Sequence, residues 1–151
     1  RMAPGPVTVG PITSAHDRRA AFAIRTAVFV DEQGVDPAAE LDEHDDDPAV
    51  VHVLARAGPR PVGTGRLRPV DPTTAKIERV AVITTHRGRG IGRQIVESLE
   101  MQAPAGTTTL MLHSQCAVEG FYAAMGYERV SGVFREEGID HVRMRRRLRG
   151  P

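Results

Sequence analysis

The stretch KIERVAVITTHRGRGIGR (residues 76–93) joins a β-type segment to a glycine-rich loop and the start of a helix. Apolar residues alternate before the loop, over residues 75–82, which predicts a strand. After it, apolar residues recur at helical spacing over residues 90–102. Near-alternating glycines let backbone amides turn toward one point, at the positive end of the helix dipole. The strand, loop and helix therefore predict an anion-binding site.

The loop consists of glycines and arginines around one isoleucine: Arg87, Gly88, Arg89, Gly90, Ile91, Gly92 and Arg93. The arginines would donate charge-assisted hydrogen bonds to a pyrophosphate or a ribose phosphate. The glycine spacing differs from G-x-G-x-x-G, and no Gly-Lys-Ser/Thr follows as in a P-loop. We therefore expect a nucleotide-like ligand on neither a Rossmann nor a P-loop fold.

The rest of the chain predicts an α/β domain with a mixed sheet. The expected elements are a strand at 7–12, a helix capped by Ser14 and reaching about residue 28, strands at 50–57, 62–70 and 107–113, a helix at 118–125, and strands at 127–130 and 141–148. The Gly58-Pro59-Arg60-Pro61 turn predicts a hairpin between the second and third strands. We expect one domain over residues 1–151, with a core at about 7–148 and loose ends.

Composition narrows the class of protein. Of the 151 residues, 40% are hydrophobic and 26% are charged, which is typical of a folded, water-soluble domain. No apolar run approaches the roughly 20 residues that cross a bilayer, and the only cysteine, Cys116, forms no intramolecular disulfide. These features predict a cytoplasmic protein with no membrane partner.

The order Arg87-x-x-Gly90-x-Gly92 after a strand resembles the acyl-CoA signature Q/R-x-x-G-x-G/A of the GNAT acetyltransferase superfamily. The resemblance extends over residues 76–82 before the loop and 121–127 after it. Upstream, residues 29–35 followed by 42–45 are similar to the small bacterial ElaA/YjcF-like branch. The resemblance to the GNAT superfamily implies a central mixed, mostly antiparallel sheet flanked by helices, with a splayed pair of strands that holds acyl-CoA.

The resemblance implies transfer of an acetyl group from acetyl-CoA to a primary amine within a ternary complex, without a metal. The main chains of Val80, Ala81 and Val82 would then contact the pantetheine arm and the thioester, and the 87–93 loop would hold the pyrophosphate. Backbone N–H groups there could polarise the thioester carbonyl. A non-catalytic acyl-CoA-binding module is the alternative from the same resemblance.

Two residues are the candidates for catalysis. Strand alternation predicts that Glu78 shares a face with Val80 and Val82, which favours it as the base, directly or through water. The alternative role for Glu78 is that of an ordinary ion-pair partner on the strand. Tyr122 matches the family tyrosine near the departing sulfur, and its alternative is a half-buried aromatic.

Five further features suggest weaker hypotheses. His113, Ser114 and Gln115 could contact the acceptor or coenzyme A. We interpret the acidic run 40–47 as a solvated loop, although it could attract a cationic acceptor or, with His44 and His52, hold a metal. Cys116 is interpreted as structural, and 143–149 as a terminal strand more than a nucleic-acid arm. An uncovered strand edge would allow a homodimer, and the identity of the amine stays open.

Overall fold

The structure is a computed structural model that describes residues 6–148. An eight-stranded sheet forms its centre, in the order β1-β2-β3-β4-β5-β8-β6, with β7 pairing onto β8. The strands are β1 (Val7–Pro11), β2 (Val51–Ala57), β3 (Arg60–Asp71), β4 (Thr74–Val82), β5 (Thr109–Gln115), β6 (Glu128–Arg129), β7 (Phe134–Glu136) and β8 (Ile139–Arg147). All pairs are antiparallel except β4 with β5, so the expected mixed, mostly antiparallel sheet is confirmed.

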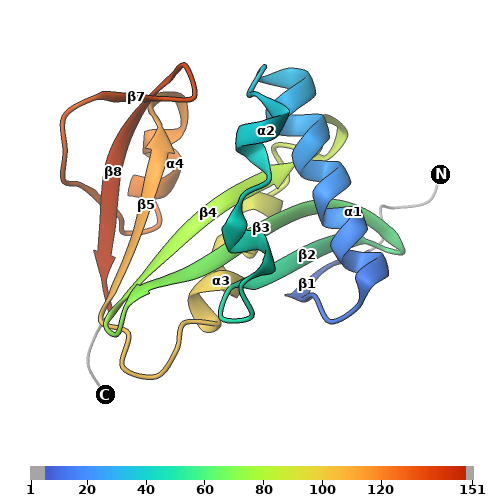
Figure 1. Ribbon diagram of the computed structural model, residues 1–151, viewed down its shortest axis with the longest axis horizontal. Coiled ribbons are helices and arrows are strands. Elements are labelled where there is room, and N and C mark those ends of the chain that lie inside the picture. Colours follow the sequence, from blue (N-terminus) through green and yellow to red (C-terminus); the bar gives the residue numbers. More distant parts are fainter. Residues whose placement is uncertain (1–5, 149–151) are drawn as a thin grey trace.

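Helices cover both faces of this sheet, with α1 and α2 on one face and α3 and α4 on the other (Figure 1). The α-helices are α1 (Ala15–Arg25), α2 (Pro37–Glu40), α3 (Ile91–Met101) and α4 (Glu119–Ala123). Helix α1 continues as the π-helical segment η1 (Thr26–Glu32), and short 3-10 turns are η2 (Glu43–Asp46), η3 (Thr84–His86) and η4 (Cys116–Val118). As predicted, Ser14 caps α1, and its hydroxyl accepts from the Asp17 amide at 3.1 Å.

Two apolar cores hold the helices to the sheet. The larger core buries Ile91, Ile95 and Leu99 of α3 against the sheet, and the smaller core buries Ile24 of α1 against Ala81. Helix α3 approaches β3 closely because Gly63 and Gly65 carry no side chain there. A Cβ on Gly63 would lie only 2.7 Å from Cδ1 of Ile95. The sequence of β3 therefore fixes the position of α3.

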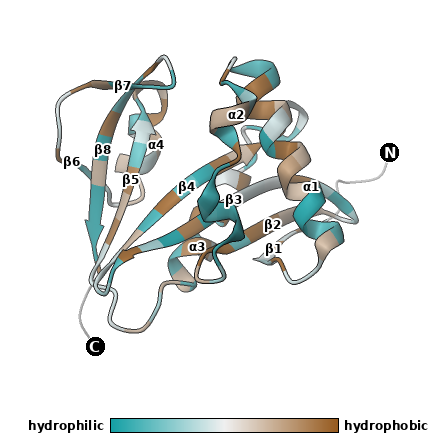
Figure 2. Cartoon of the chain, in the orientation of Figure 1, coloured by the Kyte–Doolittle hydropathy of each residue, from teal (hydrophilic) through white to brown (hydrophobic). Residues whose placement is uncertain are grey.

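The C-terminal arginine-rich segment is a strand, as expected. Val142 and Met144 of β8 are buried in the larger core, while Arg143 and Arg147 are exposed. Figure 2 shows hydrophilic residues predominating along β8. Arg149 and the other end residues (1–5 and 149–151), which we expected to be loose, lie outside the described residues.

The strands β4 and β5 form a fork. They pair only from Thr74↔Thr109 to Ile77↔Leu112, after which both strands continue without pairing to each other. Figure 1 shows the two strands diverging from this point. The predicted splay is thus confirmed, and the edge of β4 that faces β5 is open from Glu78 onward. Within residues 6–148, no helix is long and apolar enough to cross a bilayer.

Candidate active site

A cavity of about 600 Å³ opens at the fork. Tyr122, from the face that α3 and α4 cover, lines it together with Asp42 and His44, from the face that α2 covers. The cavity is therefore reached from both faces of the sheet, at the place where β4 and β5 no longer pair. Two ligands could meet there from opposite sides.

A β-bulge in β4 decides which side chains face each half of the cavity. The register with β3 shifts between Ala81, which pairs with Thr64, and Glu78, which pairs with Arg66. Arg79 lies in the bulge with φ 58°, a left-handed conformation that is rare for a residue with a side chain. Ile77 and Val80 are three residues apart, yet both pack in the larger core beneath α3. The extra residue therefore reverses which side chains of β4 face each side of the sheet.

The predicted position of Glu78 is therefore wrong. Because the bulge follows it, Glu78 lies on the α1/α2 face, whereas Val80 and Val82 lie on the α3/α4 face. Glu78 still lines the cavity, but from the opposite side of the sheet to the one the alternation predicted. Simple period-two counting fails at a bulge because two residues there oppose one on the partner strand.

Three cations surround the Glu78 carboxylate, whose side chain is only 9% exposed. The guanidinium Nη2 of Arg66 lies at 3.0 Å, Nε of Arg68 at 2.9 Å and Nζ of Lys76 at 3.2 Å. Burial by itself would raise the pKa of Glu78, but the Arg68 hydrogen bond and the charges of Arg66 and Lys76 lower it to about 2. Glu78 is thus an ion-paired carboxylate of low basicity.

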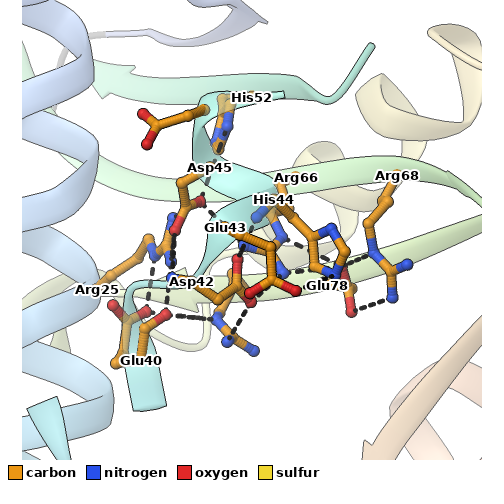
Figure 3. Close-up of polar contacts among 12 residues, drawn as sticks. Arg25, Glu40, Asp42, Glu43, His44, Asp45, His52, Arg66, Arg68 and Glu78 are labelled. Atoms are coloured by element: carbon orange, nitrogen blue, oxygen red, sulfur yellow. Dashed lines mark hydrogen bonds and ion pairs between the residues drawn. The ribbon is translucent and has the colours of Figure 1, made fainter. Parts of the chain in front are cut away.

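The acidic run is only in part the solvated loop that the sequence suggested, because Glu43, Asp46 and Asp47 are exposed while Glu40 and Asp45 are buried. Glu40 and Asp45 are 3% and 5% exposed, and both accept hydrogen bonds from the buried Arg25, at 2.7 Å in each case (Figure 3). Arg66 joins them by donating to Asp42 and Asp45. Burial alone would raise the pKa of Asp45. The hydrogen bonds from Arg25 and from the Asp42 amide, and the charges of Arg25 and Arg66, hold this pKa well below its ordinary value.

This network fastens α2 and η2 over the bulge, since Arg79 donates to the Glu40 carbonyl at 3.2 Å and to Asp42 at 3.2 Å. His52 lies beside it, with Nε2 3.9 Å from Asp45, and burial lowers the pKa of His52 to about 4. Within residues 6–148, no group of three His, Cys, Asp or Glu side chains is arranged to hold a metal ion. Glu40, Asp42 and His44 line the cavity, so the acidic run builds one of its walls.

Tyr122 stands on the other wall. Helix α4 carries it with its side chain 9% exposed, and the rings of Phe121 and Tyr127 pack edge-on against it. Its hydroxyl makes no hydrogen bond to any described residue. Burial raises the pKa of Tyr122 to about 12, so the hydroxyl keeps its proton at neutral pH. A neutral donor is thus available inside the cavity.

The glycine loop leads from β4 into α3. Gly88 and Gly90 have φ values of 76° and 79°, which favour glycine, and both are exposed. The amides of Ile91, Gly92 and Arg93 open α3 and have no acceptor within the helix. A Cβ at Gly92 would meet the Phe121 ring at 3.4 Å, so this glycine lets α4 pack beside the loop.

Arg87 differs from the other arginines of the loop. Its guanidinium binds both carboxylate oxygens of Glu32 at 2.8 Å and donates to the Val82 carbonyl at 2.9 Å. It ties the end of β4 to η1, a contact that the phosphate-binding expectation did not include. Arg89 and Arg93 are exposed, and Arg93 lies 3.8 Å from Glu97 on the same helix.

The His113–Gln115 group is divided between two faces. His113 and Gln115 line the cavity, and Gln115 donates to Gln33 at 2.8 Å. Ser114 is buried on the opposite face, with its hydroxyl donating to the Gln115 carbonyl, so its expected contact with a ligand is wrong. Alternation along a regular strand explains the division.

Glu136 is a cavity residue that the sequence did not reveal. It lies between the strands expected at 127–130 and 141–148, in a segment for which the sequence predicts no element, yet β7 pairs with β8 and brings its carboxylate to 3.0 Å from Nδ1 of His113. Phe134 and His141 accompany it, with stacked rings 6.0 Å apart. No sequence motif marks this group, because it depends on the pairing of a three-residue strand.

The sheet forks between β4 and β5, a glycine-rich loop leads from β4 into α3, and the cavity at the fork is lined from both faces. Together these features define the acyl-CoA transferase class of fold. The acetyltransferase (GNAT) domain model matches residues 17–148, and the chain belongs to this family. Two relatives are from Bacillus subtilis: the uncharacterised protein YyaT is 40% identical (91% of this chain, 93% of YyaT), and the uncharacterised N-acetyltransferase YjcF is 36% identical (82% of this chain, 88% of YjcF). The crystal structure of Escherichia coli ElaA is similar, with a TM-score of 0.81 and 26% identity over 93% of this chain and 98% of that one.

Proposed function

We propose that this protein transfers an acetyl group from acetyl-CoA to a primary amine, by direct attack in a ternary complex. The observation that carries the proposal is the cavity at the fork, which residues from both faces of the sheet line. Acetyl-CoA would enter from the α3/α4 face and the amine from the α1/α2 face. Membership of the GNAT family supports the acetyl group as the one transferred.

The glycine loop and the open edge of β4 suit the two ends of the cosubstrate. Residues 87–93 would cradle the pyrophosphate through the free amides at the start of α3, with Arg89 and Arg93 nearby. The main chains of Val80, Ala81 and Val82 would contact the pantetheine arm, because this edge has no partner in β5. Backbone N–H groups beside the bulge would polarise the thioester carbonyl.

Tyr122 would stabilise the departing thiolate by a hydrogen bond. A tyrosine with a pKa of about 12 is a much weaker acid than a thiol near 8.5, so full proton transfer would be uphill by roughly 5 kcal/mol. Hydrogen bonding needs no such transfer, and the hydroxyl has no competing partner among the described residues. Tyr122 packs on the α3/α4 wall, the side from which acetyl-CoA would enter.

The amine must lose a proton before or during attack. An alkylamine of pKa about 10.4 is neutral at pH 7 in only about one part in a few thousand. Glu78 lines the amine side of the cavity, but its pKa of about 2 leaves it roughly 8 units below such an amine. We therefore propose that Glu78 binds Arg66, Arg68 and Lys76 on the amine side of the cavity. A different residue would then act as the base.

Calorimetric titration with acetyl-CoA tests this proposal. Gly90→Glu puts a carboxylate at the proposed phosphate cradle, where it would compete with the pyrophosphate for the same amides. Gly58→Glu is the matched control, because Gly58 also has a positive φ and open space around it but lies in the β2–β3 turn. We expect micromolar binding by the wild type and the control, and at least a tenfold weaker Kd for Gly90→Glu. Wild-type protein that fails to bind acetyl-CoA contradicts the proposal.

A further inference from the structure

His113 occupies the point at which the fork opens. It is the first residue of β5 beyond the last pair with β4, Ile77↔Leu112. Its neighbours Leu112 and Ser114 are buried toward the α3/α4 face, so the imidazole lies on the amine side of the sheet. It lines the same cavity as Glu78 and Tyr122. A group here is placed to meet the amine at the proposed site of the thioester.

The contacts of His113 leave one ring nitrogen free. Nδ1 lies 3.0 Å from Oε1 of Glu136, and this hydrogen bond lowers the pKa of Glu136, which therefore stays an ionised acceptor. Nδ1 must then carry the proton that it donates, and Nε2 of the neutral ring carries a lone pair. Nε2 is buried and has no hydrogen-bond partner among the described residues. A buried acceptor without a donor costs free energy unless a ligand or water supplies one.

Phe134 and His141 hold this pair in place. The Phe134 ring packs edge-on against His113 at 5.0 Å and stacks with His141. His141 donates from Nδ1 to the Ile139 carbonyl at 2.7 Å, and its Nε2 lies 3.8 Å from the second oxygen of Glu136. One carboxylate thus lies between two histidines, and packing restricts rotation of the His113 ring.

We infer that His113, oriented by Glu136, is the general base that takes the proton of the acceptor amine. The inference rests on the proposed acetyl transfer. The amine nitrogen forms a bond to the acetyl carbonyl carbon, the C–S bond breaks, and coenzyme A leaves as a thiolate. The amine proton moves to Nε2 of His113 and then to solvent, so charge and atoms balance.

The charges around the two candidate bases favour His113 over Glu78. Three cations contact Glu78. His113 contacts a carboxylate, which favours the imidazolium formed when the proton arrives. Further titratable or charged groups of this wall and its neighbours are His141 and Arg143 on β8, Lys76 and Glu78 on β4, and Glu137 after β7. Nε2 of the neutral His113 ring has a lone pair and no partner among the described residues, whereas the Glu78 oxygens are already bound to cations.

Kinetics with His113→Gln tests the role. Coenzyme A release is measured with spermidine, phenethylamine and a peptide with a free N-terminal alanine as probe amines. We expect kcat to fall by at least about 100-fold. The acetyl-CoA Kd should change less than twofold, and the acid limb of the wild-type kcat/KM profile should disappear. His16→Gln, an exposed histidine on α1, is the control and should change none of these.

Glu136→Gln separates orientation from a merely structural effect. Loss of the carboxylate removes a stabiliser of the imidazolium, so the acid limb should move to lower pH while kcat falls less than in His113→Gln. Rescue of a His113→Ala variant by added imidazole would support the role further. Retention of more than a third of wild-type kcat by His113→Gln, with an unchanged acid limb, overturns the inference.

A measurement without any acceptor covers the case in which none of the probe amines reacts. Nitrogen-15 spectra of the histidine-labelled protein report which ring nitrogen is protonated, and His113→Gln assigns the signal. We expect a protonated Nδ1 and an unprotonated Nε2 in neutral His113. The reverse tautomer overturns the inference whatever the turnover. Acetyl-CoA binding without transfer to any probe, together with the expected tautomer, counts against the proposed acceptor class and supports the orientation of His113.

Discussion

Glu78 couples the stability of the fold to pH, because its carboxylate offsets three buried or half-buried cations. Its pKa falls from 4.5 to about 2 in the folded chain. A lowered pKa contributes stability that is present above about pH 4.5 and is lost as pH falls toward about 2. The difference of about 2.5 between the two pKa values corresponds to roughly 3 kcal/mol of folding stability at neutral pH.

We predict that Glu78→Gln lowers the free energy of unfolding at pH 7 by roughly 3–5 kcal/mol, since it leaves cations without their carboxylate. Its stability should also change less than that of the wild type between pH 5 and pH 3. Urea unfolding at several pH values measures both effects. Glu97→Gln removes an exposed carboxylate 3.8 Å from Arg93 and should cost about 0.5 kcal/mol or less. Equal losses in the two variants would contradict the role given to Glu78.

Tyr122→Phe isolates the hydroxyl from the ring. The ring packs against Phe121 and Tyr127, so phenylalanine should keep the fold and the acetyl-CoA Kd. We predict a fall in kcat of roughly tenfold, the effect of losing one hydrogen bond to a charged group. Because the pKa of Tyr122 is about 12, its ionisation should add no limb to the rate profile below pH 10. A basic limb that disappears in Tyr122→Phe would show proton transfer instead.

The contact between α3 and β3 transmits strand packing to the phosphate cradle. A Cβ on Gly65 would lie 2.8 Å from Cγ2 of Ile95 and 2.9 Å from Cδ1 of Leu99. Both neighbours are fully buried side chains of α3, so relief of this clash would move the helix. The start of that helix supplies the amides proposed to hold the pyrophosphate.

We therefore predict that Gly65→Ala lowers the free energy of unfolding by about 1–3 kcal/mol and weakens acetyl-CoA binding several-fold. Urea unfolding and calorimetry measure the two effects. Gly10→Ala in β1 is the matched control, because no atom lies within 4 Å of its added Cβ and its φ is not positive. If Gly65→Ala binds acetyl-CoA as tightly as the wild type, the position of α3 does not depend on this contact.

The sequence predicted those elements whose signals are local. The Ser14 cap, the β2–β3 hairpin and the order of strand, glycine loop and helix all follow from neighbouring residues. The bulge at Arg79 has no such signal, since residues 75–82 alternate well enough to conceal it. The wrong face for Glu78 follows directly from that one inserted residue.

Features that join distant segments could not be predicted. Arg25, Asp45 and Arg66 belong to three separate elements, and only the folded chain shows that they neutralise one another in the interior. An acidic run read alone is therefore taken as solvated. The His113–Glu136 pair likewise depends on β7, which is too short to give an alternating pattern.

At the scale of the whole molecule, the fork would place the two proposed substrates on opposite faces of the sheet, with the reacting atoms between them. Nothing in this arrangement requires an acyl-enzyme. Cys116, the only cysteine, packs against the larger core and does not line the cavity. Lys76, the only lysine, is held 3.2 Å from Glu78. Neither is presented as a nucleophile toward a thioester at the fork.

We therefore predict that the protein incubated with acetyl-CoA alone gains no acetyl group, as intact-mass spectrometry would measure. Cys116→Ser should keep kcat within about twofold, because direct attack needs no thiol. With any amine that reacts, initial velocities should give intersecting lines, as both substrates must be bound together. An acetyl adduct that a later addition of amine removes, with parallel lines, would instead require a nucleophile and two successive half-reactions. The meeting of both faces at one fork would then position each substrate in turn.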